Sequence, residues 1–233
     1  MKTYLTLLAT VAFFVAPFVT PPFAGYDPGM FPVEIARPSI QPAGYAFAIW
    51  GVIYTWLAIS AVFGLWRRDD AMWDRTRLPH LGALVLGTAW LAIANGFPIT
   101  ATVAIIAMAA FSLTAFLTAS ASVDRWWLQA PLSMFAAWLT AASMVSLGVV
   151  LSGYGWLSDT TTALTMLTVV VVVALFVQSR RPAMPLYGGA VIWASVGVAV
   201  VNWQGNPTVA YAAAAGAVLL TLAVGGLFLR RTA

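Results

Sequence analysis

The residues of this chain best suited to binding chemistry are aromatic, and they concentrate in residues 37–56, RPSIQPAGYAFAIWGVIYTW. Trp50 and Tyr54 are four positions apart, so a helix places them on one face, and Phe47 lies three positions before Trp50 on the same side. Aromatic faces stack on flat apolar molecules. A stripe of this kind also serves helix packing or interfacial anchoring. The pattern therefore predicts either a pocket wall or a packing face.

A proline-rich segment, residues 21–43, leads into the aromatic helix and contains six prolines. Proline restricts the backbone, and apolar residues such as Phe31 give the segment surface to bury. The composition predicts an ordered cap over the outer end of a helical bundle, with an interfacial loop as the alternative. Arg37 is a candidate partner for an anionic ligand group, and an ion pair with Glu34 or Asp27 is the alternative.

Groups that catalyse reactions are scarce. No Asp, Glu, Lys, Arg or His lies near the middle of a long apolar stretch, which disfavours proton-coupled and ion-coupled transporters. The chain has no HExxH motif, no Gly-rich phosphate loop and no cysteine. The single histidine, His80, adjoins Pro79 and is expected at the membrane interface, where it cannot form a metal cage alone. The sequence predicts no catalytic residues and no metal site, and hence no enzyme.

The elements that must position these residues are long apolar stretches. Hydrophobic residues make up 62% of the chain and charged residues 8%, against roughly one quarter charged in soluble domains. A membrane-spanning helix needs about 20 apolar residues. The composition therefore predicts an all-α integral membrane protein with about eight transmembrane helices. The apolar stretches cover residues 3–22, 44–66, 80–97, 98–119, 127–151, 160–178, 184–201 and 207–229.

Basic residues mark the orientation of these stretches. Lys2 precedes the first stretch, and Arg residues occupy the gaps after the second, fourth and sixth stretches and the end of the last. Positive charge stays on the cytoplasmic side, which predicts that both termini are cytoplasmic. The net charge of +4 then reflects orientation and anionic headgroups rather than nucleic acid. The first stretch also has features of a signal peptide. We expect it to be retained as a span, with cleavage within residues 1–25 as the alternative.

Three passages resemble the tryptophan-rich sensory protein family, the bacterial relatives of the mitochondrial translocator protein (TspO/MBR). The third stretch carries Trp90 and Asn95 in GTAWLAIANGF, and the fifth carries Pro131 and Trp138 in PLSMFAAWLTAAS. The family hallmark is a basic residue, two prolines and then an aromatic-rich helix. In this chain the hallmark is matched by Arg37, Pro38, Pro42, Phe47, Trp50 and Tyr54.

The resemblance implies a TspO-like five-helix bundle over residues 1–152, with the cap loop at 21–43, followed by three additional helices over 153–233. It implies a cavity under the first loop that binds porphyrin, heme or another flat lipophilic molecule, with no cofactor required. It also implies a bacterial inner membrane. The implied ligand-binding residues are Arg37, Pro42, Tyr45, Phe47, Trp50, Tyr54, Trp90, Asn95 and Trp138.

The chain departs from the family pattern at several positions. Ile40 and Gln41 stand where the family has a tryptophan between the prolines, and Ser146 replaces a common asparagine. These changes remove aromatic and polar groups from the implied pocket, so the ligand stays open. We expect a receptor or carrier-like binder in the lipid bilayer. The alternatives are an uncoupled permease and a non-catalytic accessory subunit of a larger, pigment-bearing membrane complex. Homo-oligomers are left open as partners.

The last three stretches contain few distinctive residues. The β-branched run at 160–178 predicts a lipid-facing helix. Small residues in the last two stretches, including Gly189, Gly197, Gly216 and Gly225, predict that these helices pack tightly against each other or against the first five.

Overall fold

The computed structural model describes the backbone of residues 1–120 and 123–232, and side chains up to residue 230. Its described residues form eight α-helices with short connections, which confirms the predicted all-α membrane fold. Seven helices are long and apolar enough to cross a membrane, and α7 is shorter. The helices are α1 (Lys2–Val19), α2 (Ile49–Trp66), α3 (Ala71–Ala94), α4 (Pro98–Thr118), α5 (Ala130–Gly153), α6 (Asp159–Arg180), α7 (Leu186–Asn202) and α8 (Pro207–Thr232).

The third helix begins well before the apolar stretch predicted for it at 80–97. The Asp70 carboxylate caps α3 by accepting hydrogen bonds from the backbone N–H groups of Met72 and Trp73. Arg77, in the polar second turn of α3, donates to the carbonyl oxygens of Arg67 and Arg68, just beyond the end of α2. The polar residues before position 80 therefore continue the helix, and hydropathy alone misses them.

The chain divides into two compact units by its internal contacts. Unit 1 comprises Met1–Phe23 and Ile49–Leu139, and unit 2 comprises Ala24–Ala48 and Thr140–Ala233. This division is based on internal contacts, whereas the predicted boundary after residue 152 is based on the resemblance to a five-helix family. The latter boundary stays a prediction.

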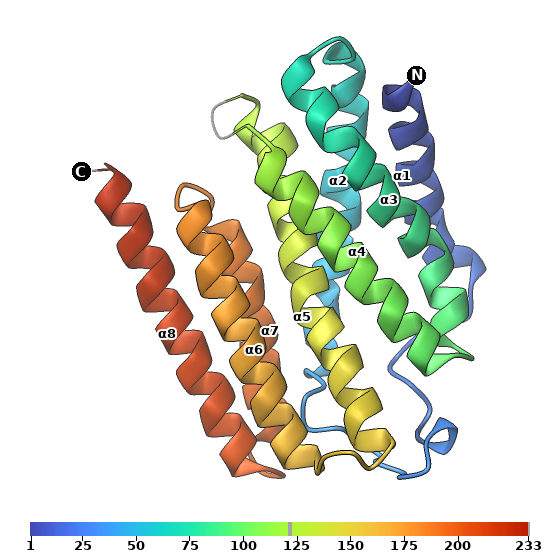
Figure 1. The fold of residues 1–233 in the computed structure, drawn as a ribbon, viewed down its shortest axis with the longest axis vertical. Coiled ribbons are helices and arrows are strands. Elements are labelled where there is room, and N and C mark those ends of the chain that lie inside the picture. Colours follow the sequence, from blue (N-terminus) through green and yellow to red (C-terminus); the bar gives the residue numbers. More distant parts are fainter. Residues whose placement is uncertain (121–122, 233) are drawn as a thin grey trace. The chain divides into compact units, whose positions relative to one another are not determined.

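Unit 1 is built around α3, which lies alongside both α1 and α4 (Figure 1). The approach of α1 to α3 is close at Phe13 and Gly87. A Cβ atom added to Gly87 would lie 2.5 Å from the Phe13 ring. The missing side chain at position 87 therefore makes room for a buried aromatic ring of α1.

Unit 2 contains α6, α7 and α8, with α8 alongside both other helices (Figure 1). The predicted tight packing of the last two helices is confirmed, but the glycine at their closest approach is Gly188. A Cβ atom on Gly188 would lie 2.3 Å from Val224, whereas Gly189 and Gly225 face open space. Helix α6 was predicted to face lipid, yet Ala163 and Ala174 are fully buried on one of its faces.

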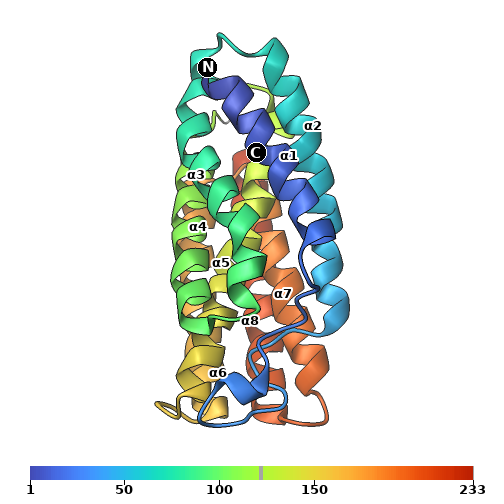
Figure 2. The ribbon, with the colours of Figure 1, turned by 90° about the vertical axis from the view of Figure 1, so that its right-hand side faces the viewer.

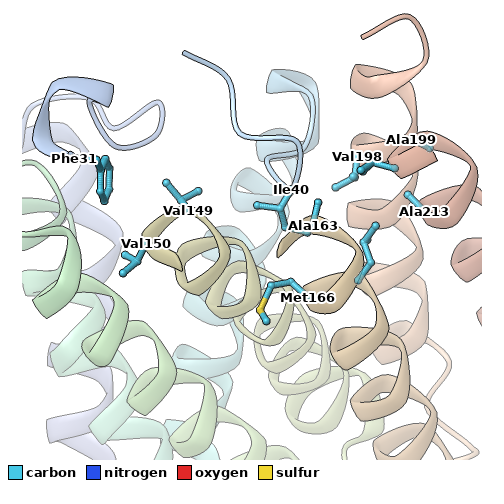
Figure 3. Close-up of a cluster of buried hydrophobic side chains, with 11 residues drawn as sticks. Phe31, Ile40, Val149, Val150, Ala163, Met166, Val198, Ala199 and Ala213 are labelled. Carbon is cyan, nitrogen blue, oxygen red and sulfur yellow. The ribbon is translucent and has the colours of Figure 1, made fainter. Parts of the chain in front are cut away.

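The proline-rich segment 24–48 is ordered and belongs to unit 2. In Figure 2 it is the blue stretch of chain near the lower ends of α6, α7 and α8. Phe31 packs against Gly153, where an added Cβ would lie 2.5 Å from its ring. Val33 N–H donates to the Gly153 carbonyl at 2.9 Å. Figure 3 shows Phe31 and Ile40 within a buried apolar cluster of unit 2. Its labelled members on the helices are Val149, Val150, Ala163, Met166, Val198, Ala199 and Ala213.

Polar bonds fix the same segment to the ends of α6 and α7. The Ser39 backbone N–H and hydroxyl both donate to the Asp159 carboxylate. Asn202 Nδ2 donates to the Ser39 carbonyl at 2.7 Å, and Asn206 Nδ2 donates to its hydroxyl oxygen at 3.1 Å. Ser39 is buried, so these bonds satisfy polar groups that water does not reach.

Candidate ligand-binding site

An aromatic cluster in unit 1 brings together Trp50 and Tyr54 of α2 with Trp138 of α5. The Trp50 and Tyr54 rings stack at 5.2 Å, and Trp50 meets Trp138 edge to face at 6.2 Å. Phe13 of α1 lies 4.9 Å from Tyr54, and Phe135 of α5 lies 5.5 Å from Phe13. Trp50 and Trp138 are 88 positions apart in sequence and therefore meet through the fold.

Burial separates the five rings into a back wall and a front. Phe13, Phe135 and Trp138 are at most 3% exposed, whereas Trp50 and Tyr54 are half-buried. Edge-to-face and stacked pairs each contribute about 0.5–1.5 kcal/mol beyond burial, so the wall holds its shape. The half-buried rings leave aromatic surface for another flat molecule. Sequence reasoning missed Phe13 and Phe135, although Phe135 precedes Trp138 by one helical turn.

Trp90 and Asn95 have other contacts. Trp90 Nε1 donates to the Ala101 carbonyl at 2.9 Å, and its ring meets Phe23 edge to face at 5.1 Å. Asn95 Nδ2 donates to the carbonyls of Pro21 at 3.2 Å and Leu91 at 3.0 Å. These bonds tie α3 to α4 and to the chain that leaves α1. The contacts explain both residues structurally, and their role in ligand binding stays a prediction.

Pro42, Tyr45 and Phe47 belong to unit 2. Phe47 lies in a short 3₁₀ turn, η2 (Gly44–Ala48), and α2 begins only at Ile49. The α-helix that carries Trp50 and Tyr54 therefore begins after Phe47, and the shared face of Phe47 and Trp50 stays a prediction. The turn forms because α7 fixes it: Ala43 N–H donates to the Gly197 carbonyl at 3.0 Å.

Because Gly197 has no side chain, the 3₁₀ turn packs closely against α7 at this position. A Cβ atom there would lie 3.0 Å from Pro42 and from Ala46. The Tyr45 ring lies 5.4 Å from the Trp193 ring, edge to face, and Trp193 Nε1 donates to the Ala46 carbonyl at 2.9 Å. Pro42 is buried by this packing, whereas Tyr45 is 46% exposed.

Arg37 lies exposed on a bend of the segment in unit 2. The alternative of an ion pair with Glu34 or Asp27 is wrong, because neither carboxylate pairs with it among the described residues. Asp27 instead accepts a hydrogen bond from Gly29 N–H at 2.9 Å. The stretch from Glu34 to Arg37 is not helical, so the two side chains do not share a helical turn. The guanidinium remains a candidate for an anionic group.

The acidic residues near α3 form ion pairs with basic neighbours, as the alternation of Asp and Arg within residues 67–77 indicates. Lys2 Nζ lies 2.6 Å from Asp74, and Arg68 Nε lies 3.2 Å from Asp69. Within the described ranges, no group of His, Asp and Glu side chains could hold a metal ion. His80, predicted at the interface, is instead buried in α3, with its ring 6.0 Å from that of Phe135.

The family model described as TSPO-like protein matches residues 3–226. The chain belongs to the TSPO-like family. The match runs from α1 into α8, so it includes the three C-terminal helices as well as the five that the resemblance covered. No curated protein and no solved structure gives a significant match. Family membership and the apolar helices together identify an integral membrane protein, and the family suggests a receptor or transporter type.

Proposed function

We propose that this protein is a membrane receptor or carrier-like protein that binds a porphyrin, heme or a similarly flat lipophilic molecule on the aromatic cluster of unit 1. The observation that carries the proposal is the meeting of Trp50 and Trp138 at 6.2 Å, with Tyr54 stacked on Trp50. Trp50 and Tyr54 of α2 are half-buried, and they pack against a buried wall that includes Trp138 of α5. A planar apolar ligand can transfer from water or lipid onto such ring faces and stack there.

The chemistry of the cluster favours apolar planar ligands over charged ones. Its five rings carry no ionisable group besides the Tyr54 phenol, so an ionic ligand group needs a cation from elsewhere. Arg37 is exposed and has no ion pair among the described residues, and it stays a predicted partner for an anionic ligand group from the family resemblance. Pro42, Tyr45, Phe47, Trp90 and Asn95 remain predicted lining residues from the family resemblance.

Substitution of the two indoles tests the site. We expect Trp50→Ala and Trp138→Ala each to weaken binding of protoporphyrin IX by about tenfold, because Trp50 supplies a stacking face and the buried Trp138 ring supports Trp50 edge to face. Binding is measured from the ligand's own absorbance during titration of purified protein, since the chain contains eleven tryptophans. Trp66→Ala is the matched control, because Trp66 is 75% exposed at the end of α2. Unchanged affinity in both cluster variants rules the site out.

The accessory-subunit function has its own supporting observation. A groove of about 630 Å³ runs along α7 and α8 and is lined by apolar residues including Val200, Ala214 and Val218. An apolar groove on a membrane helix pair suits a neighbouring transmembrane helix. If the protein is an accessory subunit, other membrane proteins copurify with it from membranes, whereas a simple ligand binder purifies alone. If it is an uncoupled permease, purified protein in liposomes increases porphyrin flux, which neither of the other functions does.

A further inference from the structure

A small, partly open polar cavity lies in unit 1, and none of the five rings of the aromatic cluster lines it. Its volume is about 30 Å³, and residues of α1, α2, α3 and the start of α5 line it. The cavity is unusual for a membrane protein interior because seven of its lining side chains carry hydrogen-bonding atoms. The lining residues are Thr3, Thr6, Ser60, Ala61, Gly64, Trp73, Thr76, Arg77, His80, Leu128 and Leu132.

His80 is the least satisfied of these side chains. It is the only histidine of the chain, lies within α3 and is 8% exposed. Its Nδ1 atom is buried and has no hydrogen-bond partner among the described residues. Leaving a buried polar atom unpaired costs about 1–3 kcal/mol. Folded proteins commonly avoid this cost by binding an ordered water.

Two hydroxyl groups from other helices line the same cavity. Neither Thr3 of α1 nor Ser60 of α2 hydrogen-bonds to another described residue, although both are buried. The Thr6 and Thr76 hydroxyls, by contrast, donate to the carbonyls of Lys2 and Trp73 in their own helices. Three helices therefore each contribute one such polar side chain to a common space.

The charged side chain in the cavity wall, Arg77, already has hydrogen-bond partners. Arg77 is 4% exposed, and its guanidinium donates to the carbonyl oxygens of Arg67 at 2.7 Å and Arg68 at 2.8 Å. It also lies 3.4 Å from the Asp74 carboxylate. An anion in the cavity would compete with these bonds and with Asp74. The occupant that fits is a small neutral molecule able both to donate and to accept.

We propose that this cavity is a specific binding site for one water molecule, hydrogen-bonded to His80 Nδ1 and to the hydroxyl groups of Thr3 and Ser60. The space suffices, because a cavity holds a water once about 10–15 Å³ is accessible to a water-sized probe and two to four polar partners are present. Such a water joins α1, α2 and α3 through Thr3, Ser60 and His80, whose side chains do not hydrogen-bond to one another directly. It also fixes the imidazole ring against Phe135, the back wall of the aromatic cluster.

Removal of a hydroxyl distinguishes a wet cavity from a dry one by the sign of the effect. In a wet cavity, Thr3→Val and Ser60→Ala each take a partner from the water, and we expect the apparent unfolding temperature to fall by about 2–4 °C. In a dry cavity the same changes remove an unpaired polar group, so the unfolding temperature stays level or rises. Thr10→Val is the control, because Thr10 is buried on α1 and bonds to the Thr6 carbonyl.

Coupling between residues without direct contact is the second expected signature. The effects of Thr3→Val and His80→Leu should be non-additive when combined, because each alone already disrupts the shared water. A structure of the wild-type protein at a resolution that shows ordered water gives the direct measurement. Density within hydrogen-bonding distance of His80 Nδ1 is expected, and an empty cavity in a well-ordered region overturns the proposal whatever the porphyrin affinity. The proposal is therefore tested separately from the ligand site.

Discussion

At the scale of single residues, Asp124 links several elements of unit 1 through the hydrogen bonds of its carboxylate. Its carboxylate accepts hydrogen bonds from Arg67 Nε at 2.7 Å and Nη2 at 3.1 Å, and from Trp73 Nε1 at 2.8 Å. The residue adopts a left-handed backbone conformation with φ of 48°, which non-glycine residues rarely take. A side chain with three bonds compensates for that conformation. Asp124 thereby joins the end of α2 and the start of α3 to the chain that enters α5.

The same bonds give a pH dependence of stability. The hydrogen bond from Arg67 holds the pKa of the Asp124 carboxyl below its ordinary value, against an opposing contribution from burial. The unfolded chain therefore binds this proton more readily than the folded one, and stability rises with pH between the two pKa values. We expect the stabilisation to be complete above pH about 4 and to be lost as the pH falls through the depressed value.

Asp124→Asn should lower the unfolding temperature at neutral pH and remove part of the acid-induced loss. Circular dichroism melts of detergent-solubilised protein from pH 7 downward measure both effects. The matched control is Asp69→Asn, since Asp69 pairs with Arg68 at 3.2 Å but is 90% exposed, and exposed pairs contribute little. If wild type and Asp124→Asn lose stability in parallel on acidification, the carboxylate is not the titrating group.

At the scale of elements, close helix packing in unit 2 depends on one missing side chain. Gly188 N–H donates to Gln178 Oε1 of α6 at 3.0 Å, and the same residue faces Val224 of α8. An alanine there would place its Cβ 2.3 Å from Val224, so the helices must separate. We expect Gly188→Ala to destabilise the protein by about 1–3 kcal/mol, the usual cost of overpacking.

The next residue supplies the control for this packing prediction. Gly189 has no atom within 4 Å of an added Cβ, so Gly189→Ala should be neutral or stabilising, since alanine favours helix by about 1 kcal/mol. Val224→Ala should partly rescue Gly188→Ala by shortening the opposing side chain. Equal effects of the two glycine substitutions, measured by thermal unfolding in detergent, would contradict a packing role specific to Gly188.

The sequence predicted the helices well because hydropathy reports directly on the need to cross a membrane. It placed the start of α3 too late, since the polar turn before His80 is stabilised by Asp70 and Arg77 rather than by apolar burial. It also favoured Gly189 over Gly188, because composition shows that small residues are present but not which of them faces another helix.

The candidate site was predictable in part for a similar reason. Trp50 and Trp138 were singled out by family resemblance, and the fold brings them together. Phe47 was assigned to the same helical face, but the 3₁₀ turn at Gly44–Ala48 interrupts the α-helical spacing. That turn is held by Gly197 of α7, more than a hundred residues away in the chain. Local spacing carries no information about such a contact.

At the scale of the whole molecule, the number of membrane crossings rests on α7. This helix has 17 residues, or about 26 Å of rise, against a hydrocarbon core of about 30 Å. A short helix is accommodated by local thinning of the bilayer. The charge pattern predicts the crossing, because Arg180 and Arg181 precede α7 and no Lys or Arg lies between α7 and α8.

Single cysteines test this topology, because the natural chain contains none. We expect Trp156→Cys and Gln204→Cys to react with a membrane-impermeant maleimide on intact cells, since both positions are exposed in loops free of Lys and Arg. Asp69→Cys, in the basic loop after α2, should react only after the membrane is permeabilised. The reverse pattern would invert the orientation. Labelling of Trp156→Cys without Gln204→Cys would mean that α6 crosses the bilayer and α7 does not, leaving seven crossings and a C-terminus on the side opposite to the N-terminus.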